Sequence, residues 1–176
     1  MSLTLRYIPN VGILINDIEL PWGIERELAR RLLNGTYKSD DQVIDLSAEH
    51  NGSVDYIFHQ KRDIYENYLI SIDKKPWEID NLFFLGYDKN NLLSEVDIHA
   101  GLQIVVIASF ISFEQKLPDI VQNLLNISPE TIQSGDGEYF FKDLKLTVSD
   151  ERAMGGEGDN LGYFYCAANV DHLIEE

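Results

Sequence analysis

Apolar residues occur along most of the chain in short runs or loose alternation, which is typical of β-strands, and two segments instead show helical spacing. The first predicted helix covers residues 24–34. Its apolar stripe, which we expect to be buried, consists of Ile24, Leu28, Leu32 and Leu33. The charged positions that we expect to face water are Glu25, Arg26, Glu27, Arg30 and Arg31. Asn34 and Gly35 form a typical helix stop.

The second predicted helix covers residues 114–126 and has Pro118 in its first turn, where a missing N–H has no cost. Its apolar face consists of Leu117, Ile120, Val121, Leu124 and Leu125. The predicted strands cover residues 3–8, 12–20, 62–72, 81–87, 92–99, 101–113, 139–149 and 161–168. Asn16 and Asp17 are expected at a hairpin tip or a bulge, and residues 73–80 and 127–138 in loops.

Two stretches follow the same order of elements, residues 12–34 and 101–126. Each begins with glycine, continues through an apolar strand and ends in a helix that closes with Leu-Leu-Asn. The segment 82–88 likewise matches 144–150, an apolar strand that runs into an acidic turn. This pattern predicts an α+β fold of two strand–helix–antiparallel-meander repeats, residues 1–100 with an insertion at 36–80 and residues 101–176, in one compact unit. One continuous curved sheet with the helices on one face is compatible with it.

The motif Gly12-Ile13-Leu14-Ile15, the helix 24–34 and the strand–turn–strand 82–99, with their second-copy counterparts, carry a resemblance. The chain resembles the tandem modules of the beta-lactamase-inhibitor-protein-like fold and of related small outer-membrane-assembly lipoproteins. Its acidic, compact character is also similar to that of immunity proteins of bacterial toxin systems. No inhibitor contact residue can be matched, and no lipoprotein signal is present, so the resemblance implies protein binding and not the lipoprotein role.

The formal net charge is −16, from 30 acidic and 14 basic residues. This charge disfavours nucleic acid and anionic membrane surfaces as partners, since both are bound through Lys and Arg. It leaves a cationic protein partner, a divalent metal or no partner at all, since acidic residues that serve only solubility would look the same. The N-terminus shows no signal-peptide pattern and Cys166 is the single cysteine, so we expect a cytoplasmic protein without a disulfide and with Cys166 buried.

The candidate chemistry is sparse, and no cofactor or metal ligand set is predicted. The glycine-rich segment 155–160 carries Glu157 and Asp159, but its spacing fits neither a calcium loop nor a phosphate cradle, and a plain hairpin loop is the preferred interpretation. Glu95, Asp97 and His99 alternate onto one face of a strand, which an acid–base or metal site would use, although a solvated strand face is favoured.

The leading hypothesis is a non-enzymatic, acidic protein-binding module, with an immunity-like inhibitor of a cationic protein or toxin as its most concrete form. The alternatives are a carboxylate- or metal-dependent enzyme built from Glu95, Asp97, His99, Glu157 and Asp159, and a structural module without a small ligand. Tyr, Trp and Arg are common at the centres of protein interfaces. The candidate binding residues are Arg62, Asp63, Tyr65, Glu66, Tyr68, Trp77, Glu157 and Asp159.

Overall fold

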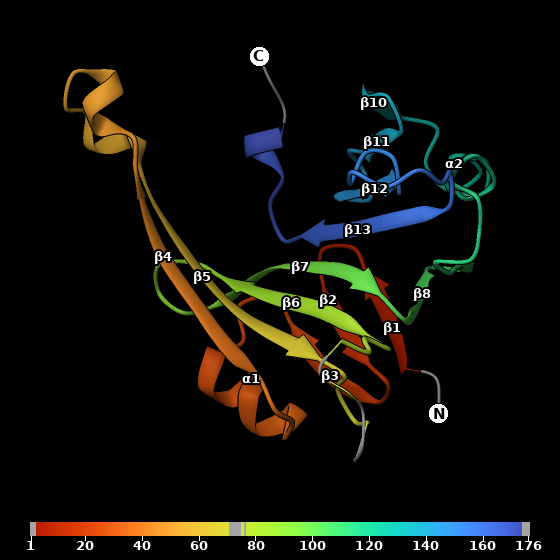
Figure 1. Ribbon diagram of the computed structural model, residues 1–176, viewed down its shortest axis with the longest axis horizontal. Helices are drawn as coiled ribbons and strands as arrows, with labels where there is room; N and C mark the ends of the chain where they lie inside the picture. Colours follow the sequence, from red (N-terminus) through yellow and green to blue (C-terminus); the bar gives the residue numbers. More distant parts are fainter. Residues whose placement is uncertain (1–2, 71–74, 76, 174–176) are drawn as a thin grey trace.

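The structure is a computed structural model that describes residues 3–70, 75 and 77–173 (Figure 1). The first half contains β1 (Leu3–Ile8), β2 (Gly12–Ile15), β3 (Ile18–Pro21), α1 (Arg26–Leu33), β4 (Lys38–Asp45), the 3-10 turns η1 (Ser47–His50) and η2 (Val54–Tyr56), β5 (Ile57–Glu66), β6 (Leu82–Tyr87) and β7 (Leu93–Ala100). The second half contains β8 (Leu102–Val106), β9 (Ser109–Ile111), α2 (Leu117–Leu125), β10 (Thr131–Gly135), β11 (Glu138–Phe141), β12 (Leu146–Asp150), β13 (Leu161–Ala167) and η3 (Asp171–Leu173).

The fold is α+β, as predicted, but its strands form two sheets and not one continuous sheet. The smaller sheet has the order β3-β2-β1-β8-β9, with β1 and β8 parallel. The larger sheet has the order β10-β11-β12-β13-β7-β6-β5-β4 and is antiparallel throughout. A hairpin, a helix and a four-stranded meander follow one another in each half, and β7 and β13, the last strands of the two meanders, pair at the centre.

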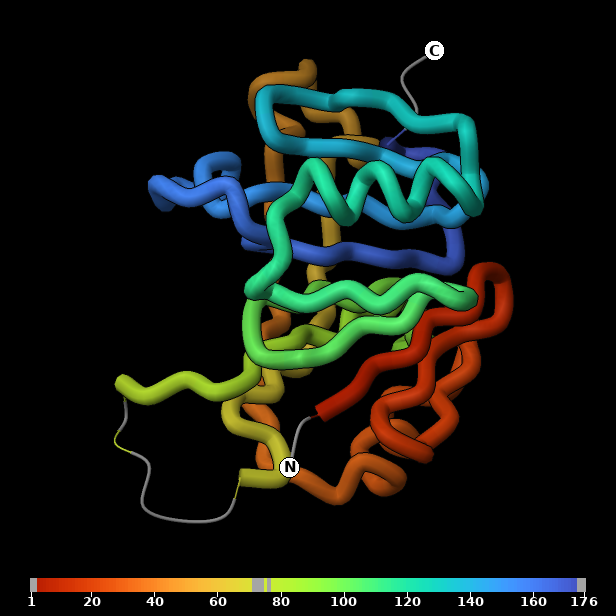
Figure 2. The backbone as a smooth tube through the Cα atoms, turned by 90° about the vertical axis from the view of Figure 1, so that its right-hand side faces the viewer, coloured from red at the N-terminus to blue at the C-terminus, as the bar shows by residue number. Residues whose placement is uncertain are grey.

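The smaller sheet and both helices lie on the same face of the eight-stranded sheet, and the main core fills the space between them (Figure 2). The core holds fully buried side chains from both layers, such as Tyr7 and Ile15 on one side and Phe83 and Phe164 on the other. No second layer of described helices or strands covers the opposite face of the large sheet, which we call the free face, and near the C-terminus this face carries a small cluster of Phe140, Tyr165, Ala167 and Val170.

The glycines that open the two similar stretches have a common physical reason. Gly12 has φ +150° and a Cβ there would lie 2.5 Å from the carbonyl oxygen of Leu20. Gly101 has φ +75° and a Cβ there would lie 1.6 Å from the carbonyl oxygen of Asp80. Both positions bring backbone against backbone at a conformation that favours glycine, so neither accepts a side chain.

The prediction for the buried stripe of α1 is confirmed for Leu33 and wrong for Leu28 and Leu32. Leu28 and Leu32 are 38% and 44% exposed, whereas Arg26 is 6% exposed and packs inward together with Ala29 and Leu33. The inward face of α1 therefore carries an arginine, because that arginine meets buried acid on the large sheet. The prediction for α2 is confirmed, with Leu117, Ile120, Val121 and Leu124 buried.

Two further segments differ from expectation. Residues 101–113 form the hairpin β8–β9 and not one strand, and the turn passes through Ile107 at φ 58°. Residues 36–61, which belong to the expected insertion, contain β4 and the first part of β5. All eight residues of β4 pair with β5, from Lys38–Ile64 to Asp45–Ile57. Part of the predicted loop at 73–80 lies outside the described residues.

Candidate protein-binding surface

The β4–β5 hairpin extends beyond the rest of the large sheet (Figure 1). β5 pairs with β6 only from Lys61 to Glu66, so the part of β5 before Lys61 has β4 as its single neighbour in the sheet. We call residues 42–60, which comprise this two-stranded ribbon and the η1–η2 tip, the arm. An isolated two-stranded ribbon is marginally stable in water, which makes a long bare arm an unusual feature of a fold.

The arm exposes a concentration of large apolar side chains. Six of the nineteen exposed large hydrophobic residues in the described part of the chain lie in it. They are Val43 (64% exposed), Ile44 (41%), Leu46 (38%), Val54 (74%), Tyr56 (38%) and Phe58 (49%). Single exposed apolar residues are normal, but a cluster of them on one element is typical of a protein-interaction site.

The charge of the arm has one sign. Residues 42–60 contain Asp45, Glu49 and Asp55 and no lysine or arginine. No residue of the arm is buried, so these carboxylates and the apolar side chains of both faces of the ribbon are accessible to solvent. The combination is apolar contact area bordered by negative charge, which matches a partner surface that is apolar and basic.

Local contacts keep the tip ordered although it has no core. The rings of His50 and Tyr56 stack at 3.5 Å between centroids. The amide of Leu46 donates to the carbonyl of Tyr56 at 3.0 Å, and the Asp45 carboxylate accepts from the amide of Ser47 at 2.9 Å. The arm is thus a shaped element and not a loose loop.

A buried ion cluster ties the base of this hairpin to α1. Asp63 on β5 is fully buried and accepts from Nε and Nη2 of Arg26 at 3.1 and 2.6 Å. It also accepts from Nε and Nη2 of Arg30 at 2.8 Å each. Arg26 additionally donates to both carboxylate oxygens of Asp41 on β4, at 3.0 and 2.8 Å. Two arginines of one helix therefore bridge two neighbouring strands.

The electrostatics of this cluster keep the acids ionised. Burial alone would raise the pKa of Asp63, but the hydrogen bonds from Arg30 and Arg26 outweigh burial and lower it. The hydrogen bonds from Arg26 likewise lower the pKa of Asp41. The rings of Tyr37 and Tyr87 lie beside these guanidiniums, at 4.4 Å from Arg30 and 5.1 Å from Arg26. The arrangement is a closed structural unit whose charges are paired with one another.

The apolar side of the arm continues onto the free face of the large sheet. Ile44 pairs with Phe58, and Asp40, four residues before Ile44 on the same face, pairs with Arg62. Arg62 forms an ion pair with Asp40 at 2.6 Å and lies 4.8 Å from the ring centroid of Phe84. On this face, the polar pairs Gln42–Gln60 and Asp40–Arg62 therefore connect the apolar residues of the arm with the centre of the sheet.

At the centre of this face, tyrosines donate to the carboxylates of the row Glu95, Asp97 and His99, the residues of the alternative acid–base site. Tyr163 donates its hydroxyl to Asp97, and Tyr165 donates to Glu95 at 2.9 Å. The ring of His99 lies between Phe84 and Tyr163, at 4.8 and 5.2 Å from their centroids.

Burial is the main cause that raises the pKa of Asp97 to about 6, against the hydrogen bond from Tyr163, which lowers it. Burial and the nearby Arg62 charge lower the pKa of His99. The two carboxylates are paired with tyrosine hydroxyls and are oriented by them.

The residues of the enzyme alternative do not converge. A cavity of about 520 Å³ is lined by His99 and Glu157, among others, but not by Glu95, Asp97 or Asp159. Asp159 instead pairs with Lys116 at 3.1 Å. Within residues 3–70, 75 and 77–173, no group of three or more His, Cys, Asp and Glu side chains is placed to hold a metal ion. Cys166 is fully buried, as predicted, and burial raises its pKa.

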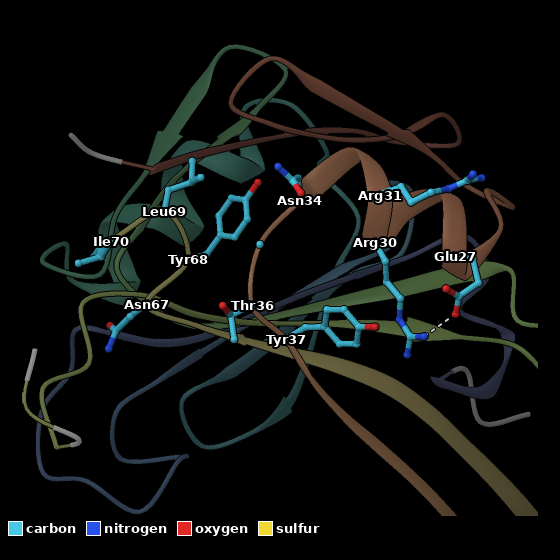
Figure 3. A pocket seen from close by; sticks show the side chains of 11 residues that line it. Glu27, Arg30, Arg31, Asn34, Thr36, Tyr37, Asn67, Tyr68, Leu69 and Ile70 are labelled. Atoms are coloured by element: carbon cyan, nitrogen blue, oxygen red, sulfur yellow. Dashed lines mark hydrogen bonds and ion pairs between the residues drawn. The ribbon is translucent and has the colours of Figure 1, made fainter. Parts of the chain in front are cut away.

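A larger cavity, of about 680 Å³, opens beside the C-terminal end of α1 (Figure 3). Arg30 points from it toward Glu27, and Tyr68 donates its hydroxyl to the carbonyl of Leu33 at 2.7 Å. A ligand site needs polar groups free to receive the ligand, and these two are engaged with the protein.

The structure divides the predicted binding residues between core and surface. Asp63, Tyr65 and Tyr68 are 0%, 0% and 3% exposed, because alternate residues of β5 and the turn after it face the core. The remaining members are at least partly accessible: Arg62, Glu66, Trp77, Glu157 and Asp159. Trp77 is 73% exposed on the loop before β6, away from the arm, and Glu157 and Asp159 lie in the loop before β13.

The sequence reasoning missed the arm itself. A usable signal was present, since residues 43–58 contain seven large apolar residues among acids and no lysine or arginine. The sequence instead favours an insertion here, because the second repeat reaches its sheet sooner than the first.

Comparisons with protein-family models, with curated protein sequences and with solved structures found no match to this chain. Among its described helices, none has the length and apolar character needed to cross a membrane.

Proposed function

We propose that this protein is a non-enzymatic, acidic binding module that captures a cationic protein through the arm and the adjoining free face of the large sheet. The observation that supports this proposal most strongly is the composition of the arm. It exposes six large apolar side chains on a ribbon that has no core of its own and no lysine or arginine. Exposed apolar surface of this kind is retained in a folded protein when a partner covers it.

The net charge of −16 supports a basic partner by electrostatic steering, which raises association rates and weakens with salt. An inhibitor of the immunity type, which must capture a toxic basic protein quickly, is the most concrete form of this proposal. The matching element order of the two halves supports a duplicated scaffold, in which the extended arm is the feature that only the first half has.

The test compares matched surface variants of the full-length protein in capture from a lysate of the source organism. One variant carries Ile44→Ser and Phe58→Ser on the arm. The control carries Ile107→Ser and Phe110→Ser, the same two residue types at even more exposed positions (57% and 71%, against 41% and 49%) on the distant β8–β9 hairpin.

We expect a basic protein that wild type and control retain at low salt, that high salt releases, and that the arm variant fails to retain. Titration of the purified partner must reproduce the difference. Equal binding by the arm variant, or no retained protein at low salt, would refute the proposal.

A further inference from the structure

The outer edge of β4 is an open strand edge. β4 is the last strand of the large sheet, and seven of its eight residues are exposed. Among the described residues, the backbone of 38–45 makes no backbone hydrogen bond other than those of its ladder with β5. The N–H and C=O groups that point away from β5 therefore face solvent, as on any edge strand.

The other edge of the same sheet is blunted, which makes a useful comparison. β10 has five residues and a register shift between Gln133 and Gly135 that interrupts its pairing with β11. Bulges and short length are the usual protection of an edge against the addition of another strand. β4 has neither: it pairs with β5 in regular register over all eight residues.

On this basis, which rests on the proposed binding function, we propose that the partner binds by strand addition: an extended segment with alternating basic and apolar residues pairs with the outer edge of β4. Main-chain hydrogen bonds would supply affinity, and side chains of the added strand would lie beside those of β4 on both faces of the sheet. Because its apolar and basic residues would lie on opposite faces, the apolar ones would meet Ile44, which is 41% exposed, and the basic ones would lie on the face of Asp45.

The negative charge of β4 and the arm tip favours a basic strand over a second copy of this chain. Asp40 and Asp41, at the inner half of β4, are already paired with Arg62 and Arg26. Asp45, at the outer end, accepts hydrogen bonds from the amide and hydroxyl of Ser47, and Glu49 and Asp55 follow in the tip. A basic strand would complement these three carboxylates. A second copy of this chain would bring another net charge of −16 against them.

Amide hydrogen exchange of the full-length protein with a synthetic decapeptide of alternating lysine and valine tests the mechanism. We expect the outward amides within residues 38–45 to exchange about tenfold more slowly with saturating peptide. Residues 131–135, the blunted edge, are the internal control and should not change. A peptide N-methylated throughout its centre lacks the amide donors and should give no protection. Glutamate in place of lysine should abolish binding, and Asp45→Asn should weaken it.

Protection that is equal at both edges, or binding that survives N-methylation, would overturn strand addition. Protection of 38–45 that rises with protein concentration in the absence of peptide would also overturn it, in favour of pairing between two copies. These outcomes are separable from failure of the binding function. The variant with Ile44→Ser and Phe58→Ser tests whether the arm binds the partner. If this variant loses the captured partner, and β4 stays unprotected in the complex of the wild-type protein, the arm binds its partner without adding a strand.

Discussion

Replacement of Asp63 by asparagine tests the buried cluster that anchors the arm. Asp63 accepts four charge-assisted hydrogen bonds from Arg26 and Arg30 at full burial, so the variant leaves two guanidiniums facing an uncharged amide. Four such bonds at face value would amount to roughly 6–12 kcal/mol, but burial of the charges offsets much of that. Removal of one partner of a buried ion pair costs about 3–5 kcal/mol, and we expect Asp63→Asn to lower the free energy of unfolding by this amount.

The assay is urea unfolding followed by circular dichroism, and the matched control is Asp159→Asn. The Lys116–Asp159 pair is exposed, with 63% and 43% side-chain exposure, and should contribute no more than about 1 kcal/mol. The pKa of Asp63 is lowered in the folded state, so its contribution is present above the unfolded pKa near 4 and is lost as the pH falls through the folded value. The difference between wild type and Asp63→Asn should therefore shrink below about pH 4.

Two results would refute this reasoning. A cost below about 1.5 kcal/mol at pH 7 would mean that the cluster is solvated like a surface pair. A cost that stays constant from pH 7 to pH 3 would mean that the negative charge of Asp63 contributes nothing, and that packing of the side chain explains the whole effect.

Three further predictions concern the assigned faces and groups. Leu33→Ala should lower the free energy of unfolding by about 2–4 kcal/mol and Leu32→Ala by less than about 1 kcal/mol, since Leu33 is 2% and Leu32 44% exposed. Equal losses in chemical unfolding would contradict the observed inward face of α1. Tyr68→Phe should lower the free energy of unfolding by about 1 kcal/mol, because it removes the hydrogen bond to the Leu33 carbonyl. Tyr65→Phe should be near neutral, because the buried Tyr65 hydroxyl has no partner within the described structure. A larger loss for Tyr65→Phe than for Tyr68→Phe would contradict these hydrogen-bond assignments. The pKa of Asp97 is raised to about 6, so the folded state holds its proton longer than the unfolded state and stability should fall as the pH rises from about 4 to 6. Asp97→Asn should remove this loss of stability with rising pH. An unchanged pH profile of the variant in thermal unfolding would contradict the raised pKa of Asp97.

Periodicity predicted those parts of the fold in which one face is buried against an apolar layer. α2, β1 and β13 are such elements, and their bounds lie within a few residues of the expected ones. The β8–β9 hairpin was missed because its turn uses Ile107 at a positive φ, where the usual signal is glycine or asparagine. β4 and the outer part of β5 were missed because both of their faces meet solvent, so burial imposes no alternation on the sequence.

The orientation of α1 was not predictable from its own residues. Leu28 and Leu32 suggest an apolar stripe, but the inward face is decided by Asp63, which lies 37 residues from Arg26 in the sequence. An acid inside the apolar run of β5 was a hint, since a buried carboxylate requires a paired cation. Which of the three arginines of the helix would supply that cation depends on the tertiary arrangement.

The ion cluster lies at the base of the arm, and we expect it to orient the arm. A well-packed apolar replacement of a buried ion pair is often as stable as the pair, so stability alone does not explain the cluster at the base of the hairpin. Its arginines reach β4 and β5 together, and thereby fix the direction in which an otherwise unsupported ribbon leaves the sheet.

Under conditions in which Asp63→Asn remains folded, amide exchange in residues 42–60 should become faster, while exchange in the β10–β11 hairpin should not. Uniform acceleration across both hairpins would show that the cluster contributes to global stability only, and that the strand pairing of the ribbon alone directs the arm.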